Sequence, residues 1–256
     1  MTKASIITPT KERESHLILL YEVILAQVET DWEWLIHDNS PTPSSFFQSL
    51  KNPKIHYFHS PKKMTIGEKR NFLCKKAKGN YIFHLDDDDY YAPDYLKKGI
   101  DNLKEADFFT LSSWFCAHVS TRRFFYWDKE SVDQSHYILN RMDSIQSRSF
   151  EFEKKEDQDD FIQKNVYGYG FCYAYRAEVA KAVAFEKTNL SEDYGFFEKA
   201  KKLGFRILAK KDQEGRVLHM MHDVNTTKSF PQYSVPSFMV YTLFPHLQTY
   251  LEKYPA

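Results

Sequence analysis

The sequence has few cysteines and no long apolar run. Three cysteines, widely spaced and without a CxxC pair, argue against a disulfide framework or a thiolate zinc site and favour a reducing compartment. No stretch approaches 18 apolar residues, and the N-terminus shows no apolar signal segment. We therefore expect a cytoplasmic protein, with membrane contact at most peripheral, at the inner membrane face.

Net charge and glycine-based phosphate motifs are also absent. Thirty-five basic residues balance 35 acidic ones, so no overall field favours nucleic acid, and we expect no nucleic-acid partner. There is no GxxxxGK[ST] loop, and Gly168-Tyr169-Gly170 lacks the third glycine of a dinucleotide fingerprint because residue 173 is tyrosine. Neither GxSxG nor HExxH occurs. These absences exclude the commonest nucleotide-binding, serine hydrolase and zinc protease motifs.

The first half of the chain alternates short apolar runs with helical periodicity. This alternation predicts βαβ units and a mainly parallel sheet with helices on both faces, an α/β fold of the Rossmann-like kind. The expected strands are residues 4–7, 32–36, 54–58 and 81–85, and the expected helices are 16–28, 43–50, 67–78 ended by Gly79, and a helix from Pro93 to about 105.

The second half is less regular. We expect paired strands at 108–120 and 122–127, a mobile loop or solvated helix face at 151–160, a strand at 171–175, and a helix at 193–203 ended by Gly204. The aromatic residues Trp114, Phe115, Tyr126 and Trp127 fit core positions for the most part, with stacking on an acceptor sugar as the alternative. An amphipathic helix at 247–254 either packs on the core or touches a membrane.

Three polar segments follow predicted strands, at Thr8-Pro9, at residues 38–40 and at residues 86–89. Since the carboxyl ends of parallel strands share one edge of a sheet, we expect them to lie together there. Two unit charges 4 Å apart repel by about 1 kcal/mol in water and about 4 kcal/mol near a protein surface. The aspartate run 86–89 is therefore either a solvated acidic turn or a cation site.

The flanks of the run favour the cation. It follows a buried strand directly, with Tyr90, Tyr91 and Pro93 behind it. On an extended backbone Asp86 and Asp88 point the same way, and paired carboxylates suit Mg²⁺ or Mn²⁺. An EF-hand is excluded, because with Asp86 as position 1 the sixth position is Tyr91 rather than glycine.

Five stretches in order resemble the family 2 glycosyltransferases, which have the GT-A fold, and cover the chain from Ser5 to about Phe230. The stretches are SIITPT at residues 5–10, IHDNS at 36–40, GEKRN at 67–71 with AKGNYI at 77–82, LDDDD at 85–89, and SEDY at 191–194. The segment from His219 to Thr226 resembles a further stretch of some soluble members, in which a histidine completes the metal shell.

The resemblance implies transfer of a sugar from a nucleoside diphosphate donor, UDP-sugar above all, to a hydroxyl of a glycan, a lipid-linked or a protein acceptor. It implies inversion, with Asp193 as general base and Glu192 orienting it or binding acceptor hydroxyls. It implies Mn²⁺ or Mg²⁺ as cofactor, held by Asp86, Asp88 and His222. The residues implied for nucleotide-sugar binding are Thr8, Pro9, Thr10, Arg13, Asp38, Arg70, Asp86 and Asp87.

Some features depart from the family pattern or leave alternatives open. His37 replaces an expected aspartate, which leaves base recognition to Asp38, and the absent QxxRW segment argues for a soluble, non-processive member. We expect one GT-A domain over 1–230, with a nucleotide-sugar half (1–107) and a smaller acceptor half (108–230), and a helical tail over 231–256. The alternatives are a sugar nucleotidyltransferase, disfavoured because the loop after the first strand lacks glycine, and an inactive carbohydrate-binding protein.

Overall fold

The computed structural model describes residues 3–132, 134–139, 145–222, 225 and 227–255. The chain divides into two compact units, each built from several segments. The first comprises the chain up to residue 87 together with 93–110 and 167–208, and the second comprises 88–92, 111–166 and the chain from 209 onwards. The proposed split into a donor half and an acceptor half stays a prediction.

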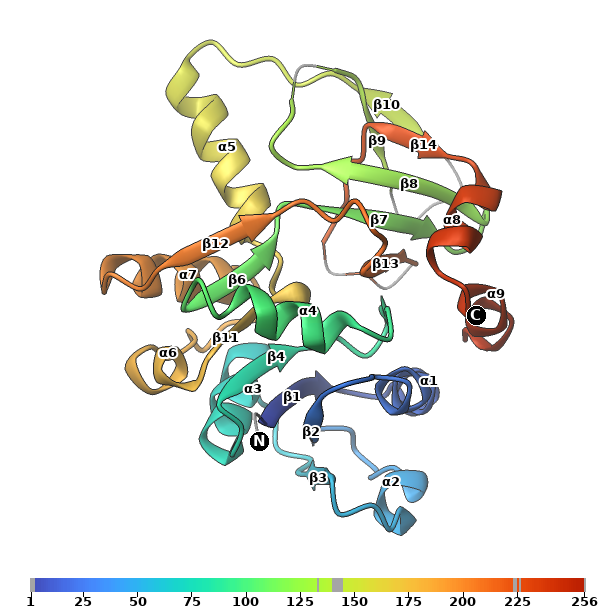
Figure 1. Ribbon diagram of the computed structural model, residues 1–256, viewed down its shortest axis with the longest axis vertical. Coiled ribbons are helices and arrows are strands. Elements are labelled where there is room, and N and C mark those ends of the chain that lie inside the picture. The colour runs from blue at the N-terminus through green and yellow to red at the C-terminus, as the bar shows by residue number, and fades with distance from the viewer. Residues whose placement is uncertain (1–2, 133, 140–144, 223–224, 226, 256) are drawn as a thin grey trace. The chain divides into compact units, whose positions relative to one another are not determined.

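The first unit is organised around a mainly parallel sheet. A seven-stranded sheet has the order β12-β6-β11-β4-β1-β2-β3, in which β1 pairs in parallel with β2 and β4, β2 pairs in parallel with β3, and β11 is antiparallel to β4 and β6 (Figure 1). The strands are β1 (Lys3–Thr10), β2 (Asp31–Asp38), β3 (Ile55–His59), β4 (Tyr81–His84), β6 (Phe108–Leu111), β11 (Ala174–Arg176) and β12 (Ile207–Lys210).

Helices cover both faces of this sheet, as predicted. On one face, Ile82 of β4 shares a core with Leu73 of α3 and Phe196 of α7. On the other face, Phe83 packs so closely against α4 that a Cβ added at Gly99 would lie 2.4 Å from its ring. The helices are α1 (Glu14–Leu25), α2 (Ser45–Ser49), α3 (Ile66–Lys76), α4 (Tyr95–Asn102), α6 (Ala177–Ala182) and α7 (Glu192–Lys202), with a 3₁₀ turn at Gly170–Cys172.

The second unit contains a smaller sheet and its own helices. A five-stranded sheet has the order β14-β8-β7-β13-β5, with β7 and β8 antiparallel as predicted. Its strands are β5 (Tyr90–Tyr91), β7 (Ser113–His118), β8 (Arg123–Asp128), β13 (Val217–Met221) and β14 (Tyr233–Val235). A hairpin is formed by β9 (His136–Ile138) and β10 (Gln146–Arg148), and the helices are α5 (Lys155–Tyr167, whose last residue belongs to the first unit), α8 (Ser237–Leu243) and α9 (Leu247–Lys253).

Two alternatives left open by the sequence are resolved in this second unit. Trp114 and Trp127 are core residues, facing each other across β7 and β8 with ring centroids 5.4 Å apart. The last helix packs on its own unit, because Leu247 and Tyr250 are buried and the Tyr250 hydroxyl donates to the Asp89 carbonyl at 3.1 Å. Within the described residues, no helix has the length and apolarity needed to span a membrane.

Several predicted boundaries were wrong. Helix α3 ends at Lys76 with Ala77 extended, so Gly79 does not end it. The strand predicted at 171–175 begins only at Ala174, because the preceding residues form the 3₁₀ turn. The aspartate run is not extended, because residues 87 and 88 form a turn. By contrast, residues 155–160 start α5 with exposed acids, which confirms the solvated helix face, and Gly204 ends α7 at φ +83°.

Candidate active site

A buried guanidinium gathers three acids in the first unit. Arg70 of α3 is 3% exposed, and its Nη1 donates to Glu192 Oε1 at 2.8 Å and to Asp193 Oδ1 at the start of α7. Its Nη2 lies 3.7 Å from Asp86 Oδ1, which follows β4. The structure thus brings together the predicted diphosphate-binding arginine, both acids of SEDY and the first aspartate of the run.

Asp193 is fixed by a second donor, the backbone N–H of Gly170, which reaches its Oδ2 at 2.9 Å. A Cβ added at Gly170 would lie 2.1 Å from Asp193 Oδ1, so only glycine allows this approach. Sequence reasoning missed Gly170. Its only signal in the sequence is the glycine pair at 168 and 170, which also resembles an incomplete dinucleotide motif.

Burial sets the protonation chemistry of this acid pair. It raises the pKa of Glu192 to about 7; the Asp193 carboxylate adds to this shift and Arg70 opposes it. Burial also raises the pKa of Asp193, against Arg70 and the Gly170 N–H, which favour the ionised carboxylate. A raised pKa makes the ionised carboxylate a stronger proton acceptor, which favours general-base chemistry.

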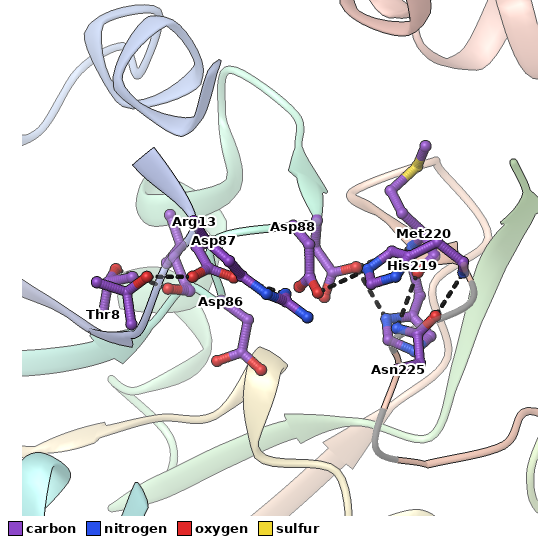
Figure 2. Close-up of polar contacts among 12 residues, drawn as sticks. Thr8, Arg13, Asp86, Asp87, Asp88, His219, Met220 and Asn225 are labelled. Carbon is purple, nitrogen blue, oxygen red and sulfur yellow. Dashed lines mark hydrogen bonds and ion pairs between the residues drawn. The ribbon is translucent and has the colours of Figure 1, made fainter. Parts of the chain in front are cut away.

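The loop after β1 is tied to the second aspartate of the run. Thr10 Oγ1 donates to Asp87 Oδ2 at 2.5 Å, and Arg13 Nη1 donates to Asp87 Oδ1 at 2.9 Å (Figure 2). The Thr8 hydroxyl donates to the Leu85 carbonyl at 2.7 Å and accepts from the Trp34 indole at 2.9 Å, so it joins β1 to its neighbours. Thr8, Pro9, Thr10 and Arg13 therefore share one strand end with Asp87, and their contact to a nucleoside stays a prediction.

Asp38 lies at the end of β2 in a dense polar setting. Its Oδ1 accepts from the Ser40 backbone N–H at 2.8 Å and from the Ser40 hydroxyl, which is the geometry of an Asx turn. Its Oδ2 accepts from the Tyr57 hydroxyl at 2.6 Å. Sequence reasoning missed Tyr57, because no local pattern in β3 indicates that its hydroxyl reaches Asp38 at the end of β2.

A second buried cation, also missed, joins the ends of β1 and β2. Lys69 of α3 is 5% exposed, and its Nζ donates to the Thr10 carbonyl at 2.9 Å and to Asn39 Oδ1 at 3.0 Å. Burial lowers the pKa of Lys69 to about 8, while Asp87 and Asp38 act to raise it. Lys69 is still mostly protonated at pH 7, so it ties together the two strand ends predicted to hold the nucleoside.

The remaining two aspartates belong to the second unit, where each meets an imidazole. Asp88 Oδ2 lies 2.9 Å from His222 Nε2, and Asp89 Oδ1 lies 2.8 Å from His219 Nδ1. Asp89 also accepts from the Met220 backbone N–H at 2.8 Å, and burial raises the pKa of its carboxyl group. Figure 2 shows Asp88 directed towards the stretch that carries His219 and Asn225.

Asp88 and His222 are the part of the predicted metal site that belongs to the second unit. In the part of the chain that the structure describes, no three His, Cys, Asp or Glu side chains form a cluster able to hold a metal ion. Asp88 and His222 do converge, and Asn225 supports them by accepting from the His222 backbone N–H and donating to the Met220 carbonyl at 3.1 Å. A carboxylate and an imidazole suit Mn²⁺ as two ligands of a larger set. Asp223, Val224 and Thr226 of the same stretch lie outside the described residues.

Comparisons with known proteins identify the family of the chain. The sequence model described as "Glycosyl transferase family 2" matches residues 5–183, more than half of the chain. WcaA of Escherichia coli (strain K12), whose name assigns it to the glycosyl transferases of colanic acid biosynthesis, is 31% identical over 96 residues, covering 36% of this chain and 34% of WcaA. A Rickettsia felis protein named as an uncharacterized glycosyltransferase is 34% identical over 110 residues, covering 42% of this chain and 18% of that protein.

Solved structures share the fold at lower identity. Residues 1–349 of Staphylococcus aureus TarS, in complex with UDP-GlcNAc, align with a TM-score of 0.58 and 18% identity over 94% of this chain and 64% of that one. The mannosyltransferase PcManGT of Pyrobaculum calidifontis, in complex with GDP-Man and Mn²⁺, aligns with a TM-score of 0.55 and 11% identity over 88% of this chain and 58% of that one.

These findings define the class of the protein. The chain has the GT-A fold and belongs to glycosyl transferase family 2. It spans about a third or less of the length of the curated relatives that it matches.

Proposed function

We propose that this chain transfers a sugar from a nucleoside diphosphate donor, a UDP-sugar, to a hydroxyl acceptor with inversion at the anomeric carbon. The observation that carries the proposal is the Arg70 cluster. One buried guanidinium contacts Asp86 after β4 and Asp193 at the start of α7, although 107 positions separate the two acids in the chain. Family membership supplies the reaction class in which such a cluster has a use.

In this proposal Asp193 is the general base. It takes the proton of the acceptor hydroxyl while the acceptor oxygen forms a bond to the anomeric carbon and the bond to the leaving diphosphate breaks. The Gly170 N–H aims its carboxylate, and Glu192 holds the other side of Arg70. A positioned base contributes about 10²- to 10⁴-fold in rate.

Charge on the leaving diphosphate is met by Arg70 of the first unit. Arg70 supplies charge-assisted hydrogen bonds to phosphate oxygens. In the second unit, Asp88 and His222 would hold Mn²⁺; the role of Asp86 as a metal ligand stays a prediction. A bound dication neutralises charge that develops on phosphate oxygens. The nucleoside contacts are assigned to Asp38 and to the Thr10 loop, which Arg13 and Lys69 hold in place.

The proposal is tested by donor turnover. The full chain would be incubated with UDP-, GDP- and ADP-sugars, with and without Mn²⁺, while release of the nucleoside diphosphate is measured. We expect Mn²⁺-dependent release of UDP that Asp193→Asn suppresses. Binding of donors without release by any variant would instead support an inactive binding protein, and the anomeric configuration of a product would test inversion.

A further inference from the structure

The C-terminal helix α9 contacts the main chain of the aspartate run within the second unit. The hydroxyl of Tyr250 donates to the Asp89 carbonyl at 3.1 Å, and the hydroxyl of Tyr254, the residue directly after α9, donates to the Asp88 carbonyl at 3.0 Å. Residues four positions apart lie on the same side of a helix, so one side of α9 reaches two successive carbonyls. We call Tyr250 and Tyr254 the tyrosine clamp.

Ring packing holds the tyrosine clamp against this segment. Tyr250 is buried, and its ring centroid lies 5.1 Å from that of Tyr90, the first residue after the aspartate run. Phe244, shortly before α9, also packs on Tyr90, with ring centroids 5.7 Å apart. The rings of Tyr250 and Tyr254 are themselves 5.7 Å apart. The two hydroxyls are therefore positioned by contacts between rings as well as by the hydrogen bonds that they donate.

The carbonyls that the clamp binds lie just before the main chain enters a sheet. Residue 88 belongs to a turn, and the pairing of β5 with β13 begins at Tyr90. A buried carbonyl at such a position needs a donor from outside the strand ladder. The path of the main chain at Asp88 determines where its carboxylate points, and that carboxylate lies 2.9 Å from His222 Nε2. A donor on the Asp88 carbonyl therefore helps to fix this side chain.

We propose that the tyrosine clamp positions the Asp88 carboxylate for metal binding together with His222, which makes the C-terminal helix part of the candidate site. The inference rests on the proposed function, because that function assigns Mn²⁺ to this pair. Tyr250 and Tyr254 are positioning residues, since each hydroxyl binds a main-chain carbonyl and not the ion. The match to the family model ends at residue 183, so the clamp lies outside the part of the chain that carries the family pattern.

The deciding variant is Tyr254→Phe, which removes one hydroxyl and keeps the ring beside His222. Mn²⁺ binding to the full chain in the presence of UDP is measured without turnover, from the electron paramagnetic resonance signal of free Mn²⁺. We expect the Mn²⁺ affinity to fall about three- to tenfold, the range that one lost hydrogen bond supplies. The double variant with Tyr250→Phe should weaken Mn²⁺ binding further, because it removes both donors.

The matched control is Tyr126→Phe, which removes a hydroxyl that donates to Ser113 Oγ at 2.7 Å in the same unit. This change also costs one hydrogen bond, but at a distance in the chain from the aspartate run, so its Mn²⁺ affinity should stay within about twofold of the unmodified chain. Thermal melting compares the stability that the two variants lose. A shift in Mn²⁺ affinity confined to Tyr254→Phe separates positioning from general loosening of the unit.

Hydrogen exchange of the metal-free chain tests the clamp without any ion. Loss of the Tyr254 hydroxyl should speed exchange in the peptide that covers residues 88–92 by about three- to tenfold, because this segment loses one of its anchors. Exchange in β7, the central strand of the same sheet, should stay unchanged.

Different outcomes contradict the inference and the proposed function. If Tyr254→Phe leaves exchange at residues 88–92 unchanged, or shifts the Mn²⁺ affinity no more than Tyr126→Phe does, the inference is overturned. If the unmodified chain binds no Mn²⁺, the metal assignment fails and the inference fails with it. If the chain binds Mn²⁺ in a clamp-dependent manner but never releases UDP from a UDP-sugar, the proposed transfer fails while the inference stands.

Discussion

The two halves of the aspartate run face different kinds of side chain. In the first unit, Asp86 and Asp193 face the Arg70 guanidinium, and Asp87 faces Arg13. In the second unit, Asp88 and Asp89 face the imidazoles of His222 and His219. One continuous acidic stretch thus supplies two electrostatic settings that lie in different compact units.

The two kinds of partner differ in whether they can lose a proton and so expose a lone pair. A guanidinium stays charged and offers only donors, so the acids around Arg70 are held by a permanent cation. A neutral imidazole has a lone pair as well as an N–H, and it ligates metals readily. The Arg70 cluster therefore suits binding of a fixed negative charge and proton transfer by its acids. The Asp88–His222 pair suits metal binding, in which the hydrogen bond between the two side chains is replaced by bonds to the metal.

The strongest test of the first setting is Asp193→Asn. We expect the transfer rate to fall by about 10²- to 10⁴-fold, because the amide cannot take a proton, while UDP binding is kept. The rate and the UDP dissociation constant are measured together, with Asp159→Asn on the exposed face of α5 as the control. A rate within fivefold of the unmodified chain would remove Asp193 from the role of base.

Removing the permanent cation is the next largest change. Arg70→Met leaves Glu192, Asp193 and Asp86 without their shared donor, and breaking a buried pair in this way costs about 3–5 kcal/mol of unfolding free energy. The exposed pair of Arg206 and Asp107 is the matched control, because such pairs contribute about 0–1 kcal/mol. Urea denaturation of Arg70→Met and Arg206→Met measures the difference, and equal losses would contradict the contrast.

The roles of the two imidazoles in the second unit are distinguished by substituting one histidine at a time. His222→Ala removes a predicted metal ligand, so we expect about tenfold more Mn²⁺ for half-maximal turnover, in line with the effect of altered metal surroundings. His219→Ala removes the imidazole that faces the buried Asp89 and should lower stability, while the Mn²⁺ requirement stays unchanged. Mn²⁺ titrations and thermal melts of both variants test this. Equal Mn²⁺ shifts in the two variants would count against the assignment of His222.

The sequence predicted the sheet and the acids better than it predicted their partners. The strand–helix alternation and the run at 86–89 are local patterns, and periodicity is sufficient to find them. Asn39, Tyr57, Lys69 and Gly170 were missed because their roles arise from contacts between distant segments. Lys69 and Arg70 illustrate the limit: both are buried on α3, while other basic residues of the same helix are exposed, and composition does not distinguish them.

The turn within the run was missed for a similar reason. Four consecutive aspartates after a buried strand were expected to continue as extended chain, which places Asp86 and Asp88 on one side. The structure turns at residues 87 and 88, because Asp87 is drawn to Thr10 and Arg13 in the first unit while Asp88 belongs to the second. Tertiary partners therefore override the local pattern.

The subtlest prediction concerns the proton held beside Arg70. The pKa of Glu192 is raised from 4.5 to about 7, so between these values the folded state binds more protons than the unfolded state. The contribution of this group to stability is therefore complete below about pH 4.5 and is lost as the pH rises through about 7. Because Asp193 lies beside it, the titration step belongs to the pair.

Glu192→Gln removes this titration while keeping a side-chain oxygen for Arg70. We expect the unfolding free energy of the unmodified chain, relative to that of Glu192→Gln, to decline by about 1–3 kcal/mol between pH 4.5 and 7.5. Urea denaturation across this range measures the difference, with Glu178→Gln, exposed on α6, as the control. A difference that is flat with pH would mean that Arg70 keeps both acids ionised, and the permanent cation would then dominate burial in this cluster.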